Sequence, residues 1–181
     1  MSGSSSLHLP IIVMGVSGCG KSSVAQLLAE TLGRRFVEGD TLHPPENIVK
    51  MSAGIPLDDA DRVGWLGRIA AEIRSGDVPA PIVSCSALKQ KYRQQLRDGA
   101  KRPVRFLYLE VPRDQVLARM NARTDHFMPA GLVDSQFSIL EDPSLESDVI
   151  SIAGPGTVSQ LASRFLFRLQ MQSAARPRDL L

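Results

Sequence analysis

Short apolar segments alternate with amphipathic segments along most of the chain. The apolar segments are predicted to be strands, and they cover residues 10–14, 36–38, 81–85, 104–111 and 148–153. Between strands, apolar residues recur at helical spacing. Strands separated by helices predict an α/β fold in which a five-stranded parallel sheet is flanked by helices on both faces.

Several local signals place the ends of the predicted helices. After the first strand, Val24, Leu28 and Leu32 share one helix face, and Gly33 follows where helices often end. A later helix is capped by Asp58 or Asp59 and ends near Gly76. The other predicted helices are a short one within 42–54, a basic one over 89–99, and those over 113–123, 133–141 and about 158–169.

The domain organisation is simple. No internal repeat or interdomain linker is visible, so residues 10–173 are predicted to form one domain. Residues 1–9 are predicted to be a disordered extension and residues 174–181 a loose tail.

Composition removes several classes of protein. A hydrophobic fraction of 43% and a charged fraction of 22% are ordinary for a globular chain of 181 residues. A net charge of +2 does not indicate a nucleic-acid or membrane partner. Cys19 and Cys85 lack metal-site spacing and are predicted to be free thiols in a reducing compartment. With no apolar run of roughly 18 residues and no secretory signal, we expect a cytoplasmic location.

The first strand leads into a glycine-rich motif. Residues 15–22 fit G-x-x-x-x-G-K-[ST], the P-loop whose backbone N–H groups cradle phosphates. Lys21 is predicted to reach the β- and γ-phosphates of ATP and Ser22 to ligate Mg²⁺. A chance match is the alternative, but the position between a strand and a helix is the context that the motif requires. The residues predicted to contact ATP are Gly15, Val16, Ser17, Gly18, Cys19, Gly20, Lys21, Ser22 and Ser23.

The residues at the ends of the strands narrow the class of P-loop protein. No N-K-x-D motif is present, and neither the third nor the fourth strand ends in the Asp of a Walker-B motif. Both observations argue against motor and switch ATPases. The second Mg²⁺ contact is therefore expected from Glu38 or Asp40, just after the second strand.

Two arginines precede a polar segment. Arg119 and Arg123 are one helical turn apart and lie on one face. They are candidates to stack on adenine and to clamp the transferred phosphoryl group, with residues 124–132 as a small lid. The alternative is a solvated basic helix face.

Several segments resemble the gluconokinase family, a branch of the shikimate-kinase-like P-loop kinases. They run in family order from about residue 11 to residue 152. Gly64 and Ser84 depart from the residues that the family usually carries, Pro and Ala. The matching segments are 14–22 (MGVSGCGKS), 38–45 (EGDTLHPP), 47–51 (NIVKM), 54–58 (GIPLD), 85–89 (CSALK), 126–128 (HFM) and 134–136 (DSQ), with Asp61, Arg62, Trp65, Leu66, Tyr92 and Arg93.

The resemblance implies ATP- and Mg²⁺-dependent phosphorylation of the terminal hydroxyl of gluconate, by a homodimer. Asp40 would orient and deprotonate the hydroxyl, and Arg62 would hold the substrate carboxylate. Arg119 and Arg123 would be the lid arginines, with Arg123 and Lys21 catalytic. The groups that would bind hydroxyls are His43, Ser86, His126 and Gln136.

Each of these roles has a simpler alternative. Asp40 is equally typical of a loop or cap carboxylate. His43 and His126 could be ordinary surface histidines. Arg62 could form an exposed ion pair with Asp58 or Asp59. Trp65 is most simply a core residue. The basic residues between 89 and 105 could form a solvated face.

Two rival functions stay open at this point: a kinase of the same fold for another small acceptor, such as shikimate or a nucleotide, and a nucleotide-binding regulator without turnover.

One further hypothesis concerns Cys19. Its place inside the P-loop, beside Lys21, predicts a lowered thiol pKa and faster alkylation than at Cys85.

Overall fold

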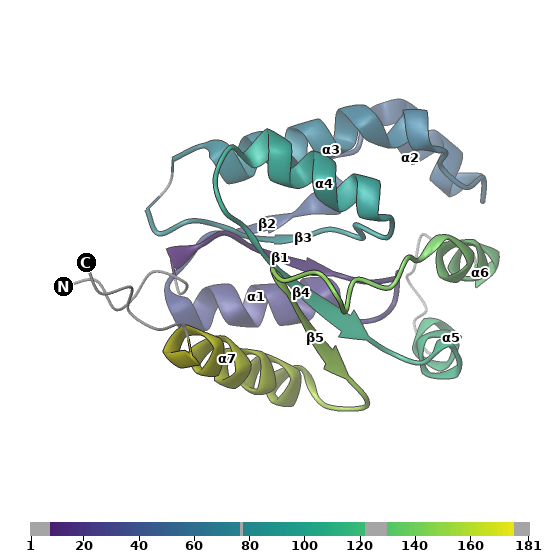
Figure 1. Cartoon of the computed structure of the whole chain (residues 1–181). Helices are drawn as coiled ribbons and strands as arrows, with labels where there is room; N and C mark the ends of the chain where they lie inside the picture. Colours follow the sequence, from purple (N-terminus) through teal and green to yellow (C-terminus); the bar gives the residue numbers. More distant parts are fainter. Residues whose placement is uncertain (1–7, 77, 122–129, 176–181) are drawn as a thin grey trace.

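Five parallel strands form one sheet in the part of the chain that the structure describes, in the order β2-β3-β1-β4-β5 (Figure 1). A computed structural model describes residues 8–76, 78–121 and 130–175. The strands are β1 (Ile11–Met14), β2 (Phe36–Glu38), β3 (Ile82–Ser84), β4 (Arg105–Glu110) and β5 (Val149–Ala153). The predicted fold class and all five predicted strands are confirmed.

Helices cover both faces of this sheet. Figure 1 shows α1 and α7 on one face, α2, α3 and α4 on the other, and α5 and α6 beyond the carboxyl ends of the strands. Their bounds are α1 (Lys21–Leu32), α2 (Pro45–Ser52), α3 (Asp59–Arg74), α4 (Gln90–Ala100), α5 (Arg113–Asn121), α6 (Ala130–Ile139) and α7 (Val158–Ala175), with a 3₁₀ helix, η2 (Gly39–Leu42). No helix among the described residues is both long and apolar enough to cross a membrane.

The core has two halves, one on each face. Alternate residues of β1 point to opposite faces, so Ile11 and Val13 pack towards α1 and α7, whereas Ile12 and Met14 pack towards α3 and α4. All four side chains are fully buried. Near-continuous apolar strands of this kind are expected where both faces of a parallel sheet are covered.

The start of α3 is fixed by a reciprocal cap. The Asp58 side chain accepts a hydrogen bond from the Asp61 backbone N–H at 2.8 Å, and the Asp61 side chain accepts one from the Asp58 N–H at 2.9 Å. Asp58 is therefore the N-cap residue, which resolves the predicted choice between Asp58 and Asp59.

Some element boundaries and one short element differ from prediction. Helix α6 spans Ala130–Ile139 rather than residues 133–141, and the 3₁₀ helix η2 was not predicted. The η2 turn depends on Gly39, because a Cβ there would lie 2.0 Å from the Ser84 carbonyl oxygen. Most of the predicted lid, residues 124–129, lies outside the described residues, as do most of residues 1–9 and residues 176–181.

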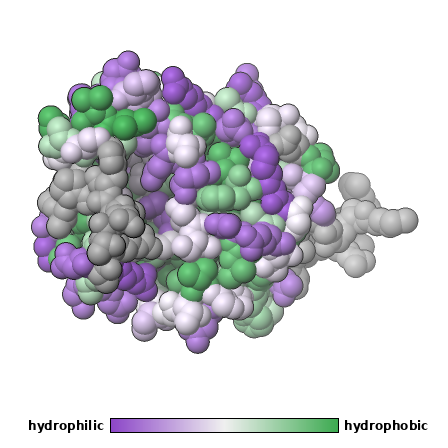
Figure 2. Space-filling model, turned by 180° about the vertical axis from the view of Figure 1, so that it is seen from behind, coloured by the Kyte–Doolittle hydropathy of each residue, from purple (hydrophilic) through white to green (hydrophobic). Residues whose placement is uncertain are grey.

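The face opposite to that of Figure 1 carries interspersed hydrophilic and hydrophobic residues (Figure 2). This surface agrees with the ordinary composition of the chain.

Candidate active site

A pocket lies at the carboxyl ends of β1, β2 and β3, where ligands bind in open parallel sheets. Its walls come from the P-loop, η2, the α2–α3 region, the turn after β3 and α6. The lining residues are Ser17, Lys21, Asp40, His43, Met51, Ile55, Pro56, Leu57, Arg62, Trp65, Ser86, Ser135 and Gln136.

The P-loop connects β1 to α1 with the geometry of an anion site. Gly15 has a φ of 139°, and a Cβ at this position would lie 3.0 Å from the Leu109 carbonyl oxygen, so only glycine fits without strain. Helix α1 starts at Lys21 and its N-terminus has no side-chain cap. First-turn N–H groups without a side-chain acceptor attract phosphate oxygens.

Lys21 belongs to the same anion site. Its side chain is buried, and Nζ donates to the Val16 carbonyl oxygen at 3.0 Å, which holds the ammonium over the loop. The Ser22 hydroxyl follows on the first turn of α1. Backbone donors, a lysine and a hydroxyl form the set that suits a nucleotide triphosphate with Mg²⁺.

The predicted lowering of the Cys19 thiol pKa is wrong. The side chain is fully buried in the core half that faces α1 and α7. Burial raises the pKa of the Cys19 thiol, and this effect outweighs the opposite influence of Lys21 and Arg119. The sequence correctly placed Cys19 in the loop but did not show that the side chain points inward.

We therefore expect neither thiol to be alkylated rapidly in the folded protein, because burial also raises the pKa of Cys85 to about 12. Iodoacetamide labelling at pH 7.5, mapped by mass spectrometry, should find both sites only after unfolding in denaturant. Rapid labelling of native Cys19 would contradict this prediction.

Asp40 lies on η2 with its carboxylate exposed in the pocket. Among the described residues the carboxylate accepts no hydrogen bond, so it is not a cap. The backbone before it is fixed, because Trp65 Nε1 donates to the Gly39 carbonyl oxygen at 2.8 Å and the Gly39 N–H donates to Ser84 Oγ at 3.1 Å. A carboxylate that is positioned but not paired is available to a substrate proton.

Glu38, the other acidic candidate, is already engaged. The Ser84 hydroxyl donates to its carboxylate. Ser84 stands where the family usually has Ala, and its hydroxyl makes this hydrogen bond between the ends of β2 and β3 possible. Of the two candidate acidic residues, Asp40 is the one that lines the pocket.

Arg62 is a buried cation on α3. Its Nη1 donates to the Leu57 carbonyl, to the Asp58 carbonyl at 3.1 Å and to the Tyr92 hydroxyl at 3.3 Å, and its guanidinium lies 5.4 Å from the Tyr92 ring centroid. The alternative of an ion pair with Asp58 or Asp59 is wrong. Asp58 caps α3, and the Asp59 carboxylate pairs with Lys89 and Lys91 and accepts from the Tyr92 hydroxyl instead of contacting Arg62 directly.

The consequence is a guanidinium with no carboxylate partner among the described residues. Burying a cation costs free energy unless an anion compensates for it. Arg62 therefore marks the position in the pocket where a ligand carboxylate is favoured.

His43 is also buried rather than a surface residue. Its ring stacks on that of Trp65, with 4.1 Å between centroids and 12° between planes. Burial, and then the charge of Arg62, lower the pKa of His43 to about 4, so the imidazole is neutral at pH 7.

Two further predicted residues close the pocket. The Ser86 side chain lines it, and its carbonyl accepts a hydrogen bond from the Gly15 N–H at 3.3 Å. Gln136, on α6, accepts from the Ser17 N–H at 2.8 Å and donates to the Ser17 hydroxyl at 3.0 Å. Helix α6 is thereby joined to the P-loop across 119 positions of sequence.

Of the predicted lid arginines, the structure describes one. Arg119 on α5 donates to the Cys19 carbonyl oxygen at 3.1 Å, so its guanidinium lies against the P-loop. Arg123 and His126 lie outside the described residues.

Comparisons with known proteins agree with this geometry. A family model described as an AAA domain matches residues 11–142. The gluconokinase of Gluconobacter oxydans (strain 621H) is 44% identical over 148 residues, which cover 80% of this chain and 82% of that relative. The thermosensitive gluconokinase of Escherichia coli (strain K12) is 44% identical over 144 residues, with 78% and 76% covered. The chain belongs to the gluconokinase family.

A solved structure extends the comparison to the whole fold. The crystal structure of a gluconokinase from Sinorhizobium meliloti 1021 superposes with a TM-score of 0.85 at 42% identity, covering 93% of this chain and 95% of that one. Shikimate kinase from Acinetobacter baumannii, at 20% identity and a TM-score of 0.62, shares the fold.

Within this gluconokinase family member, sequence reasoning missed the role of Trp65. Its buried position was predicted and is confirmed, but the indole also lines the pocket, stacks on His43 and holds the Gly39 carbonyl. A signal was present, because Trp65 follows Arg62 by three positions and residues at this spacing share a helix face. Asn47 and Tyr92, which contact His43 and Arg62, were not assigned roles either.

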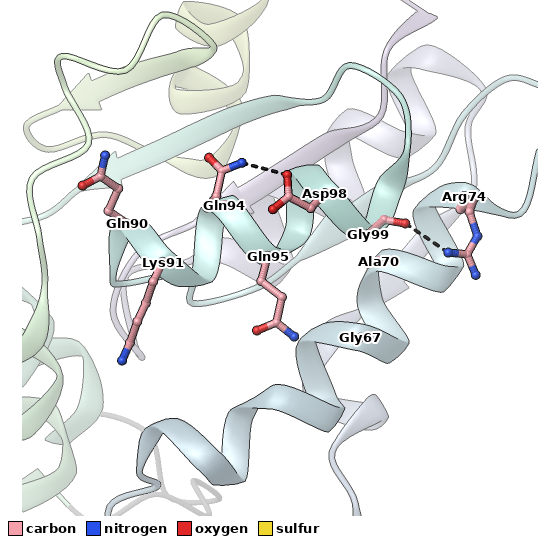
Figure 3. A pocket seen from close by; sticks show the side chains of 9 residues that line it. All are labelled: Gly67, Ala70, Arg74, Gln90, Lys91, Gln94, Gln95, Asp98 and Gly99. Atoms are coloured by element: carbon pink, nitrogen blue, oxygen red, sulfur yellow. Dashed lines mark hydrogen bonds between the residues drawn. The ribbon is translucent and has the colours of Figure 1, made fainter.

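A second hollow lies between α3 and α4, away from the P-loop. Figure 3 shows Gln94 bonded to Asp98, and Arg74 bonded to the Gly99 carbonyl at its end. None of the predicted site residues lines it. All of its lining residues belong to α3 and α4 and none to the P-loop, so it is not the candidate active site of this gluconokinase family member.

Arg119→Ala should raise the KM for ATP by about 10-fold or more, because a hydrogen bond from a charged group contributes roughly 1.5–3 kcal/mol. The KM for the second substrate should change little. Steady-state kinetics with ATP varied at a saturating acceptor concentration measures the effect. Unchanged ATP kinetics would show that Arg119 does not contribute to nucleotide binding.

Proposed function

We propose that this chain transfers the γ-phosphoryl group of ATP to the terminal hydroxyl of D-gluconate, giving 6-phospho-D-gluconate and ADP. The observation that carries the proposal is the content of one pocket. The residues that line it include a P-loop lysine, Lys21, together with Asp40 and Arg62. Among the described residues, the Asp40 carboxylate is unpaired and the buried Arg62 cation has no direct acidic partner. Family membership supports the same activity.

The reacting end of the pocket lies between the P-loop and η2. The terminal hydroxyl oxygen attacks the γ-phosphorus, its proton passes to the Asp40 carboxylate, and the bond to the β-phosphate oxygen breaks as ADP leaves. Lys21 and the N–H groups at the start of α1 offset the charge on the phosphoryl oxygens. Mg²⁺, held by the Ser22 hydroxyl and phosphate oxygens, would offset further negative charge.

The recognition end lies against α3. A gluconate carboxylate bound by Arg62 would find a partner that is already oriented by three hydrogen bonds and by the Tyr92 ring. Little side-chain freedom then has to be lost on binding. His43, Ser86 and Gln136 line the same pocket. Ser86 and Gln136 are proposed to bind the hydroxyls, and His43 is proposed to donate to the end of the substrate that Arg62 holds.

The oligomeric state and the cellular setting complete the proposal. The family resemblance supports a homodimer, and buried free thiols at Cys19 and Cys85 suit a reducing cytoplasm. Light scattering coupled to size-exclusion chromatography tests the dimer directly.

ATP consumption with a panel of acceptors tests the proposed activity. We expect turnover with gluconate, much weaker turnover with the sugar alcohol glucitol, which lacks the carboxylate, and none with shikimate. A preference for shikimate would instead identify the chain as a kinase of the same fold that acts on another small acceptor. Binding of ATP without turnover of any polyol acid would instead favour the regulatory protein.

Arg62→Lys should raise the KM for gluconate by about 10- to 100-fold with a smaller change in kcat. Lysine keeps the charge but loses the planar set of donors that fits a carboxylate and that bonds to Tyr92 and the loop carbonyls. The KM for ATP is the internal control. An unchanged gluconate KM would place the carboxylate elsewhere.

A further inference from the structure

Asn47 connects His43 to the start of α3. Its side chain is 3% exposed, and its Nδ2 lies 2.8 Å from the Asp61 carbonyl oxygen and 3.2 Å from His43 Nδ1. Nothing in the family resemblance gives Asn47 a role beyond its place in a matching segment. The geometry around it determines where the imidazole proton lies.

The orientation of the Asn47 amide follows from its bond to Asp61. A carbonyl oxygen only accepts hydrogen bonds, so the amide nitrogen must face it, because the reverse orientation would bring two acceptors together. The same nitrogen faces His43 Nδ1. Since Nδ2 donates there too, Nδ1 accepts and carries no proton.

The neutral ring must then carry its proton on Nε2. This nitrogen has no hydrogen-bond partner among the described residues, and His43 lines the pocket. The ring cannot turn over easily, because it is stacked on Trp65. His43 is therefore held as a hydrogen-bond donor towards the pocket.

The Asp61 carbonyl is itself in a rigid frame. Asp61 belongs to the reciprocal cap of α3, and its carboxylate forms an ion pair with Lys50 of α2 at 2.7 Å. That carboxylate is thus occupied and does not draw a proton onto His43. The charged group that influences the imidazole is Arg62, whose positive charge disfavours a second proton.

We propose that Asn47 is a positioning residue that fixes His43 as a neutral Nε2–H donor, so that His43 and Arg62 form a donor-only subsite for the carboxylate end of an aldonic acid. The proposal rests on the proposed function and deepens it. Asp40, which lines the same pocket, is acceptor-only when ionised, so the pocket distinguishes an acid with a terminal hydroxyl from a sugar alcohol, which has hydroxyls at both ends.

Paired variants of His43 test the donor requirement. Gln and Glu have nearly the same size, but Gln can donate to the substrate whereas Glu is an anionic acceptor. His43→Gln should raise the KM for gluconate by no more than about 10-fold, and His43→Glu by about 100-fold or more, as expected when a donor to a charged group is replaced by a like charge. The KM for ATP should stay within about threefold in both. Equal gluconate KM values for the two variants would overturn the donor subsite.

Nitrogen-15 NMR of the imidazole rings tests Asn47 separately from activity. In the unaltered protein at pH 7.5, the His43 ring should carry its proton on Nε2, with the signal assigned by its loss in His43→Gln. Asn47→Asp replaces the donor by a carboxylate and should move a proton to Nδ1 while raising the gluconate KM. A proton on Nδ1 in the unaltered protein would overturn the proposal even if Asn47→Asp does not fold.

The two levels of the proposal fail in different ways. If the unaltered protein does not phosphorylate gluconate, the proposed function is wrong whatever the NMR shows. If it does phosphorylate gluconate but His43 carries its proton on Nδ1, only the assignment of Asn47 and the donor subsite is wrong.

Discussion

Asp40→Asn is expected to lower kcat with gluconate by about 10²- to 10⁴-fold, while the KM for ATP stays nearly unchanged. Asparagine has the same size as aspartate but cannot accept the proton of the attacking hydroxyl. The backbone at Gly39 is held by Trp65 and Ser84, so the substitution should leave the η2 turn in place. The effect should therefore appear in kcat rather than in nucleotide binding.

Asp98→Asn provides a matched control, because Asp98 is an exposed carboxylate of the α3–α4 hollow and, among the described residues, its side chain is bonded only to Gln94. Its kinetics should equal those of the unaltered protein. Near-normal turnover in Asp40→Asn would remove Asp40 from the mechanism, and a comparable loss in Asp98→Asn would show that the assay reports stability instead.

Lys21→Ala is expected to lower kcat/KM for ATP by about 10²- to 10³-fold, the loss typical of removing one donor that stabilises charge in the transition state. Gluconate binding, measured by calorimetry, should weaken far less, because the ammonium is held over the P-loop through Val16. Both constants can be compared in one preparation.

Lys91→Ala is the corresponding control, since Lys91 forms an exposed ion pair with Asp59 and such pairs contribute little. Thermal melting should show Lys21→Ala to be folded. If ATP kinetics were intact in folded Lys21→Ala, the assignment of the P-loop as the phosphate site would be wrong.

The sheet and the P-loop could be predicted because their signals are local. Apolar strands of a doubly covered sheet are visible as short runs, and the glycines of residues 15–20 follow the first of them directly. Asp40 could be proposed for the same reason, because the carboxyl ends of parallel strands meet at one edge.

Contacts between distant segments could not be predicted. The bonds of Gln136 to Ser17 and of Arg62 to Tyr92 depend on how α6, α3 and α4 pack, which no periodicity specifies. The error at Cys19 has the same origin. Nearby positive charge was visible in the sequence, but the burial that outweighs it depends on which way the loop turns the side chain.

The most direct test of the central assignment is the identity of the product. The purified protein is incubated with MgATP and uniformly ¹³C-labelled gluconate, and the mixture is followed by ³¹P and ¹³C NMR. We expect ADP and one phosphomonoester in equal amounts, with ¹³C–³¹P coupling at the terminal carbon of the substrate. Phosphate on another oxygen, or ADP formed without any phosphorylated gluconate, would contradict it.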